Sequence, residues 1–373
     1  MWGDDMISVD EMRKLVRDEY DWDNIHIGVL GSHSALDVLD GAKDEGFKTV
    51  VICQRGREKP YLRFKRLCDE VIILDKFRDM VREEVQERLR ELNTIFVPNR
   101  SFSVYVGYDN IENVLRIPLF GSRHLLRAEE RVGEVNYYRI LDAAGIRRPK
   151  TFKDPSEIDR PVIVKAMAAG SVERAFFVAM SPEDFWSKVE ELKRQGLITD
   201  KEIREASIEE LVIGVDFNFN YFNSIIRNEL EFHGIDRRLQ TNIHGFVRLP
   251  ANIQLELKDF TIRNVEIGHM LATIRESQLV KVFDMGERFV ETLEKMYPPG
   301  IIGPFTLQTI VTEKLEFVVV DVAFRIGGGT NVWAGIGSQY SKFYFGEPIS
   351  IGRRIAIEIR EAIENDSLDK IVT

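Results

Sequence analysis

The sequence contains few cysteines and no long apolar stretch, and each shortage excludes a class of protein. Only Cys53 and Cys68 occur among 373 residues, and they form neither a CxxC pair nor a zinc-ligand spacing. We therefore expect two free, partly buried thiols in a reducing compartment. No apolar run approaches the roughly 18 residues of a membrane span, and residues 1–5 show no secretion signal. The chain is accordingly predicted to be cytoplasmic.

An excess of positive charge is also absent. The 51 basic and 61 acidic residues give a net charge of -10, which disfavours binding to nucleic acid or to an anionic membrane. Small phosphorylated ligands are still compatible with this charge, because single arginines and backbone N–H groups bind them locally. The composition, 44% hydrophobic and 30% charged without low-complexity segments, is typical of a globular protein, and the length suits two or three subdomains.

The first third of the chain alternates apolar strands with amphipathic helices, which predicts an open, mostly parallel sheet. The expected strands span residues 25–30, 49–53, 71–74 and 95–97. The first of them runs into the turn Gly31-Ser32-His33-Ser34, which leads into a helix. A helix ending near Leu141 is then followed by Gly145 and Pro149, which are stop signals.

From residue 162 the pattern changes to paired strands, which is typical of antiparallel sheets. These strands are expected at 162–165, 175–179, 208–213, 216–222, 303–311 and 317–322. Residues 350–363 alternate apolar and charged residues at helical spacing and are predicted to form a surface helix. The fold class predicted is therefore α/β.

Lys165 lies at the end of a predicted buried strand, where its ammonium can reach a phosphate while its stem packs on apolar neighbours. A single strand-end lysine is more often only solvated. The segment Ile208 to Asp216, with Glu210 inside it, follows Lys165, and the segment Val318 to Arg325 comes last. This order resembles the ATP-grasp superfamily.

That resemblance implies an ATP-grasp fold preceded by a Rossmann-like parallel-sheet domain. It implies an N-terminal domain over 1–124, a small ATP-grasp subdomain over 125–215 and a C-terminal subdomain over 216–373. In such enzymes the lysine touches phosphate, residues after the glutamate offer backbone groups to adenine, and an acid past the glycine holds ribose. The residues implied to bind ATP are Lys165, Glu210, Leu211, Val212, Asp216 and Gln240.

The last strand of such proteins carries an acid for magnesium and then an arginine, which matches Asp321 and Arg325. Lys165 and Arg325 are thereby implied to be catalytic through neutralisation of the transferring phosphate. A second acid is expected on the preceding strand, but Gln308 stands there and offers a neutral carbonyl oxygen. The implied metal ligands are Gln308 and Asp321, and the implied cofactors are ATP and Mg²⁺.

Six further segments narrow the resemblance over nearly the whole chain; they are residues 31–34, 97–102, 234–238, 274–277, 300–305 and 328–331. Together they resemble the archaeal formate-dependent synthetases of 5-formaminoimidazole-4-carboxamide ribonucleotide. A loop that leaves the carboxyl end of a parallel strand offers N–H groups to a phosphate. Without the resemblance, Ser32 would be interpreted as a helix cap and His33 as an exposed loop residue. The residues implied to bind substrate are His33, Ser101, His269, Ser32, Ser34 and Asn331.

Several departures from the family pattern leave alternatives open. The segment 166–174 keeps one glycine where the family has a glycine-rich loop over the ATP phosphates, and its Glu173 would repel them. Gln240 and His269 stand where the family has a nucleotide-binding acid and a substrate-binding asparagine.

The implied function is an ATP- and formate-dependent ligase that formylates the imidazole carboxamide ribonucleotide through formyl phosphate, in purine biosynthesis and as a homo-oligomer. The alternatives are a diverged paralogue that ligates another amine, and a catalytically silent nucleotide-binding or regulatory protein.

Overall fold

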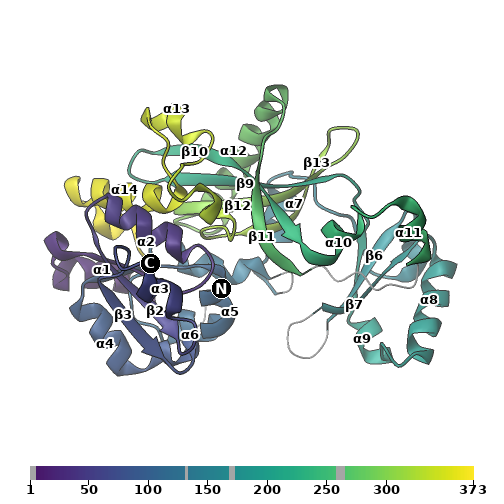
Figure 1. Cartoon of the computed structure of the whole chain (residues 1–373), viewed down its shortest axis with the longest axis horizontal. Helices are drawn as coiled ribbons and strands as arrows, with labels where there is room; N and C mark the ends of the chain where they lie inside the picture. Colours follow the sequence, from purple (N-terminus) through teal and green to yellow (C-terminus); the bar gives the residue numbers. More distant parts are fainter. Residues whose placement is uncertain (1–5, 131–132, 168–172, 258–264) are drawn as a thin grey trace. The chain divides into compact units, whose positions relative to one another are not determined.

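A computed structural model describes residues 6–130, 133–167, 173–257 and 265–373 (Figure 1). The chain forms two compact units. The first unit comprises Met1–Ile146, Asp216–Gln308 and Asp321–Thr373, and the second comprises Arg147–Val215 and Thr309–Val320. The boundaries after residues 124 and 215 stay a prediction. Within the described ranges, no helix is both long enough and apolar enough to cross a membrane.

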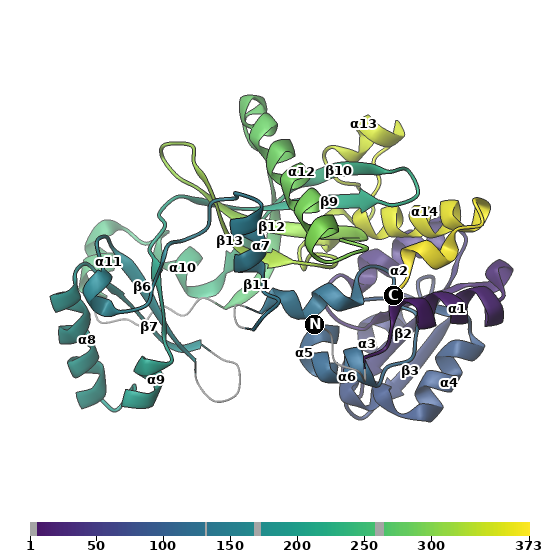
Figure 2. The same ribbon diagram turned by 180° about the vertical axis from the view of Figure 1, so that it is seen from behind.

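The first unit contains the predicted parallel sheet. Its order is β3 (Glu70–Leu74), β2 (Lys48–Gln54), β1 (His26–Leu30) and β4 (Thr94–Val97), and every pairing is parallel. The helices of this region are α1 (Val9–Glu19), α2 (Ala35–Asp44), α3 (Lys59–Arg63), α4 (Glu83–Glu91), α5 (Arg100–Val106) and α6 (Tyr108–Asn113), and Figure 2 shows them from behind. Because β1 pairs with β4, the loops that follow these two strands lie at one edge of the sheet.

A five-stranded sheet follows, in the order β11 (Glu266–Ala272), β10 (Glu229–Gln240), β9 (Val215–Ser224), β12 (Gly303–Val311) and β13 (Phe317–Ala323). Strands β9, β10 and β11 pair antiparallel, as the change of pattern predicts. The helix α12 (Leu279–Met296) buries an apolar face that includes Phe289 and Leu293. The sequence patterns did not reveal β10, which carries many charged residues, or β11.

The helix expected to end near Leu141 is not continuous. The structure has a 3₁₀ helix over Arg123–Glu129 and a short helix α7 over Tyr137–Ala143. The side chain of Asn136 accepts a hydrogen bond from the Arg139 N–H, so α7 begins with its own cap.

The second unit contains a smaller sheet in the order β5 (Thr151–Phe152), β8 (Ser207–Glu210), β6 (Val162–Met167) and β7 (Glu173–Ala179). All its pairings are antiparallel. The helices α8 (Pro182–Arg194) and α9 (Asp200–Arg204) belong to the same unit, and Phe185 and Val189 of α8 join Val162 and Val164 in its apolar core. This core fixes β6, the strand that carries Lys165.

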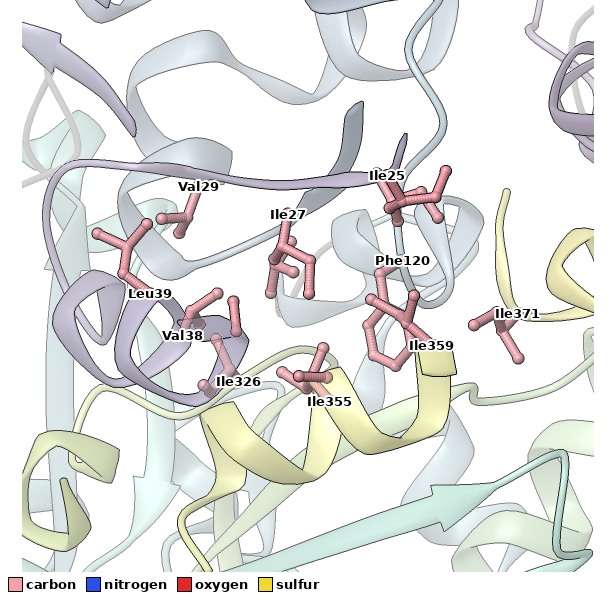
Figure 3. Close-up of a cluster of buried hydrophobic side chains, with 14 of the residues drawn as sticks. Ile25, Ile27, Val29, Val38, Leu39, Phe120, Ile326, Ile355, Ile359 and Ile371 are labelled. Carbon is pink, nitrogen blue, oxygen red and sulfur yellow. The ribbon is translucent and has the colours of Figure 1, made fainter. Parts of the chain in front are cut away.

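The main apolar core of the first unit joins its two ends in sequence. Side chains from β1, α2 and α14 (Ile351–Glu364) meet there, as Figure 3 shows for Ile27, Val38 and Ile355. At the contact between α2 and α14 a Cβ on Gly41 would clash with the backbone at residues 352 and 353, so only glycine permits this approach.

The prediction that residues 350–363 form a surface helix is wrong, although the helix itself exists as α14. Arg354 and Glu358 look like surface residues, but both side chains are fully buried. The Arg354 guanidinium donates to Glu231 at 2.8 Å and to Glu358 at 2.9 Å. Opposite charges inside the protein therefore satisfy each other, and the charge pattern alone does not report exposure.

Replacement of Ile355 by alanine should lower the free energy of unfolding by about 2–5 kcal/mol, because it leaves a cavity in the core that joins α14 to β1. Chemical denaturation followed by circular dichroism measures this change. The matched control is Glu364→Ala at the exposed end of the same helix, which should stay within about 0.5 kcal/mol of the wild type. Equal losses in both variants would contradict the core assignment.

Candidate active site

A cavity of about 390 Å³ lies within the first unit, where the loops after β1 and β4 meet the antiparallel sheet. His33 follows β1, and Arg100 begins α5. The antiparallel sheet contributes Asp236, Arg238, His269, Gln308 and Asp321. A loop of three glycines, 327–329, lies on the wall, and a Cβ on Gly329 would clash with Asp236 and His269.

Hydrogen bonds join the two loops that enter the cavity from the parallel sheet. The amide of Asn99 donates to the carbonyl oxygens of Leu30 and His33, both at 2.9 Å. Ser101 donates to Ser32 at 2.7 Å, and Ser34 donates to the carbonyl oxygen of Gly327. Because these serines and Asn99 hold the loop backbone, His33 is left as the side chain of that loop that lines the cavity.

A buried carboxylate, Glu129, binds two arginines that face the cavity. Its Oε1 lies 3.1 Å from Nε of Arg325, and its Oε2 lies 3.1 Å from Nη1 of Arg100. Oε1 also accepts the backbone N–H of Phe324 at 3.1 Å. The Glu129 side chain is 3% exposed, whereas Arg100 is 44% exposed, so the carboxylate is the fixed partner and Arg100 presents charge toward the cavity.

A second group of charges centres on His269. Its Nδ1 lies 2.6 Å from Asp236 and its Nε2 lies 2.9 Å from Glu266. Burial acts to lower the pKa of His269, but the hydrogen bonds and charges of these two carboxylates prevail and raise the pKa to about 9. His33 has the opposite tendency, since desolvation and the nearby Arg325 and His269 lower its pKa despite Glu266. The cavity therefore holds one charged and one neutral imidazole at neutral pH.

The residues expected to bind metal, Gln308 and Asp321, share one cationic neighbour. Nη2 of Arg238 donates to the Gln308 side-chain oxygen and lies 4.0 Å from Oδ2 of Asp321. Oxygen donors of this kind, one neutral and one anionic, suit Mg²⁺ that takes its remaining ligands from phosphate oxygens, and the Arg238 guanidinium lies beside both of them. No group of three or more His, Cys, Asp or Glu side chains that could hold a metal occurs among the described residues.

The other residues expected to bind substrate or nucleotide lie outside the cavity wall. Asn331 accepts the backbone N–H of Asp37 at 3.3 Å, and Asp216 pairs with Arg237 at 2.7 Å. The Gln240 backbone N–H is bound to His244 at 2.8 Å. These three positions stay a prediction.

The expected ATP ligands of the second unit are partly engaged with their own neighbours. Lys165 lies 3.2 Å from Glu209, and Glu210 pairs with Arg147 at 3.0 Å. The Leu211 N–H donates to the Pro161 carbonyl at 2.9 Å, while Val212 is half-buried. Residues 168–172 of the altered glycine loop lie outside the described residues.

Sequence reasoning missed several residues that line the cavity, namely Arg100, Glu129, Asp236, Arg238 and Glu266. Arg100, Asp236 and Arg238 stand inside the short segments that carry the family resemblance, which is a signal that they contribute to the site. Glu129 and Glu266 lie in no such segment.

The raised pKa of His269 predicts a loss of stability at alkaline pH. A histidine whose pKa is higher in the folded than in the unfolded state stabilises the fold below its unfolded value and loses that contribution as pH rises through about 9. We expect the free energy of unfolding to fall by on the order of 2–3 kcal/mol more between pH 7 and 10 in the wild type than in His269→Asn. Denaturant titrations across this pH range measure the slopes, and parallel slopes would contradict the assignment.

Comparison with known sequences identifies the family models and the relatives that the chain matches. Residues 27–152 match a model described as a protein of unknown function, DUF1246, and residues 184–373 match a domain of unknown function, DUF1297. The chain is 45% identical to the 5-formaminoimidazole-4-carboxamide-1-(beta)-D-ribofuranosyl 5'-monophosphate synthetase of Methanobrevibacter smithii, over 96% of this chain and 97% of the relative. It is 46% identical to the same synthetase of Methanocaldococcus jannaschii, over 99% of this chain and 100% of the relative.

Solved structures agree with these relatives. The crystal structure of the IMP biosynthesis protein PurP from Thermococcus kodakaraensis matches with a TM-score of 0.72 at 28% identity, over 93% of this chain and 100% of that one. An ADP complex of an N5-carboxyaminoimidazole ribonucleotide synthetase matches with a TM-score of 0.59 at 14% identity, over 88% and 78%, and shows the fold alone. The ATP-grasp fold expected from the sequence is confirmed, and the chain belongs to the family of 5-formaminoimidazole-4-carboxamide ribonucleotide synthetases.

Proposed function

We propose that this chain is an ATP- and formate-dependent ligase that formylates 5-aminoimidazole-4-carboxamide ribonucleotide in purine biosynthesis. Relatives at 45% and 46% identity over nearly the whole chain carry the corresponding synthetase name. The observation that carries the proposal is the cavity, in which Arg100, Arg238 and Arg325 gather around oxygen acceptors. Such a set of cations suits the transfer of a phosphoryl group between small anions.

In the first step a formate oxygen attacks the terminal phosphorus of ATP, the bond to the bridging oxygen breaks, and ADP leaves. The product is formyl phosphate. No protein nucleophile is required, so the contribution of the chain is to position the anions and neutralise charge. Arg325, fixed by Glu129, and Arg100 supply positive charge from the cavity wall, and Lys165 is the further cation that the family resemblance assigns to phosphate.

In the second step the exocyclic amine of the ribonucleotide attacks the formyl carbon, and inorganic phosphate leaves as the C–N bond forms. The amine nitrogen must then lose a proton. His33 lies on the cavity wall and its pKa is lowered, so its neutral imidazole can accept that proton near neutral pH. His33 therefore has a role beside substrate binding, and Ser101 supports the same loop through Ser32.

Gln308 and Asp321 are the residues that would hold Mg²⁺. When bound, the ion neutralises charge on the phosphate oxygens and orients them. The proposal includes no nucleic-acid or membrane partner, and it includes assembly as a homo-oligomer, the commonest arrangement of soluble enzymes that associate.

The test is phosphate release from ATP and Mg²⁺ with formate, with and without the ribonucleotide, together with the mass of the product. We expect ribonucleotide-dependent release and a formylated product. Asp321→Asn should lower turnover by about a hundredfold or more, because it removes the anionic metal ligand. Glu313→Gln, an exposed acid in the turn of the same hairpin, is the control and should keep full activity.

Phosphate release that does not depend on the imidazole ribonucleotide but is stimulated by another amine would identify a diverged paralogue instead. ATP binding without any release, from a folded sample, would favour the nucleotide-binding alternative. Equal activity of Asp321→Asn and Glu313→Gln would show that the metal ligands are placed incorrectly.

A further inference from the structure

The side chain of Arg238 stands where two metal ligands meet. It extends from β10 into the cavity, and its Nη2 donates to Gln308 while lying 4.0 Å from Asp321. The other side of the same guanidinium, Nε, lies 3.0 Å from Oε2 of Glu266. Arg238 thus contacts the oxygens of Gln308 and Asp321, which a metal ion would need as ligands, and it is held separately by Glu266.

The contact with Glu266 is held in place from behind. Oε1 of Glu266 lies 2.9 Å from Nε2 of His269, and the other nitrogen of that ring lies 2.6 Å from Asp236. Asp236 is itself fixed, since Asn218 and Asn220 donate to its two oxygens at 2.7 and 2.8 Å. The carboxylate that anchors Nε of Arg238 therefore cannot turn away without breaking this chain of hydrogen bonds.

The charges of the metal ligands explain why Arg238 matters. Gln308 is neutral and Asp321 carries a single negative charge, so the pair offers little attraction for a free divalent cation. A guanidinium beside the same oxygens repels that cation, and its hydrogen bond occupies a lone pair of the Gln308 oxygen. Phosphate oxygens arriving with the metal would supply both the missing negative charge and new acceptors for the freed N–H groups.

We propose that Arg238 makes metal binding depend on phosphate binding. Its guanidinium excludes a free divalent cation from Gln308 and Asp321. These two side chains then bind only a metal ion that arrives together with a nucleoside triphosphate. Through Nε Arg238 stays paired with Glu266, and the released Nη2 turns to the phosphate oxygens. Arg238 is then a specificity-determining residue, because it distinguishes the metal–nucleotide complex from the free metal ion. This inference rests on the proposed function for the identity of the nucleotide.

The test is Mn²⁺ binding to the full chain without nucleotide, measured from the free-ion signal in electron paramagnetic resonance. Arg238→Gln should bind Mn²⁺ at least about tenfold more tightly than the wild type, because the competing cation is gone. Arg237→Gln is the matched control, since the neighbouring arginine pairs with Asp216 outside the cavity wall, and it should match the wild type. Arg238→Lys keeps the charge and should stay within about threefold of the wild type.

Two further measurements define what overturns the inference. Asp321→Asn added to Arg238→Gln should abolish the gain, which places the ion at the expected ligands. Unchanged or weaker Mn²⁺ binding in Arg238→Gln, or a gain that survives Asp321→Asn, would overturn the inference. If Arg238→Gln does not fold, the comparison moves to Arg238→Met, which also removes the charge and should raise Mn²⁺ affinity at least about tenfold. No gain in that variant would equally overturn the inference.

Failure of this inference is distinct from failure of the proposed function. The Mn²⁺ titration uses neither formate nor ribonucleotide, whereas the ligase is tested by phosphate release and product mass. If Arg238→Gln binds Mn²⁺ more tightly than the wild type but the wild type forms no product, only the ligase proposal fails. A wild type that forms product while Arg238→Gln shows no gain loses only the role of Arg238.

Discussion

The carboxylate of Glu129 is the contact on which the arrangement of the cavity depends. It receives Arg100 from the start of α5, next to the parallel sheet, and Arg325 from the segment just after β13, at the antiparallel sheet. It also accepts the backbone N–H of Phe324, so the chain around Arg325 is fixed as well as its side chain. A buried acid between two arginines is fully paired. Removal of the acid would leave the arginine charges uncompensated, and removal of the arginines would leave the buried carboxylate unpaired.

This contact and the His269 group divide the cavity into two electrostatic regions. Around Glu129 the two arginines outnumber the carboxylate, which suits anions that bind between the loops of the two sheets. Around His269 the acids Asp236 and Glu266 are compensated by the imidazolium and by Arg238. The first region suits a transferring phosphoryl group, because positive charge must face its oxygens, whereas the second region fixes Arg238 beside Gln308 and Asp321.

The sequence predicted the parallel sheet well, because buried strands such as β1 are continuous apolar runs and their helices show a clear apolar spacing. It did not reveal β10, whose residues include Glu231, Asp236 and Arg238, because these charges are satisfied by partners that are distant in sequence. The error over α14 has the same origin, since Arg354 and Glu358 are paired inside the protein. Glu129 and Arg325 are separated by 196 residues, and no local pattern reports a pair of that kind.

The most direct measurement is binding of the ribonucleotide and of ATP to Glu129→Gln by calorimetry, with thermal unfolding as a check on the fold. If Glu129 organises the cavity, both ligands should bind at least about tenfold more weakly, a loss of about 1.4 kcal/mol for each. Glu112→Gln is the matched control, because Glu112 is also buried and paired with an arginine, Arg127, but does not line the cavity. Unchanged affinity for both ligands in a folded Glu129→Gln protein would contradict this central role.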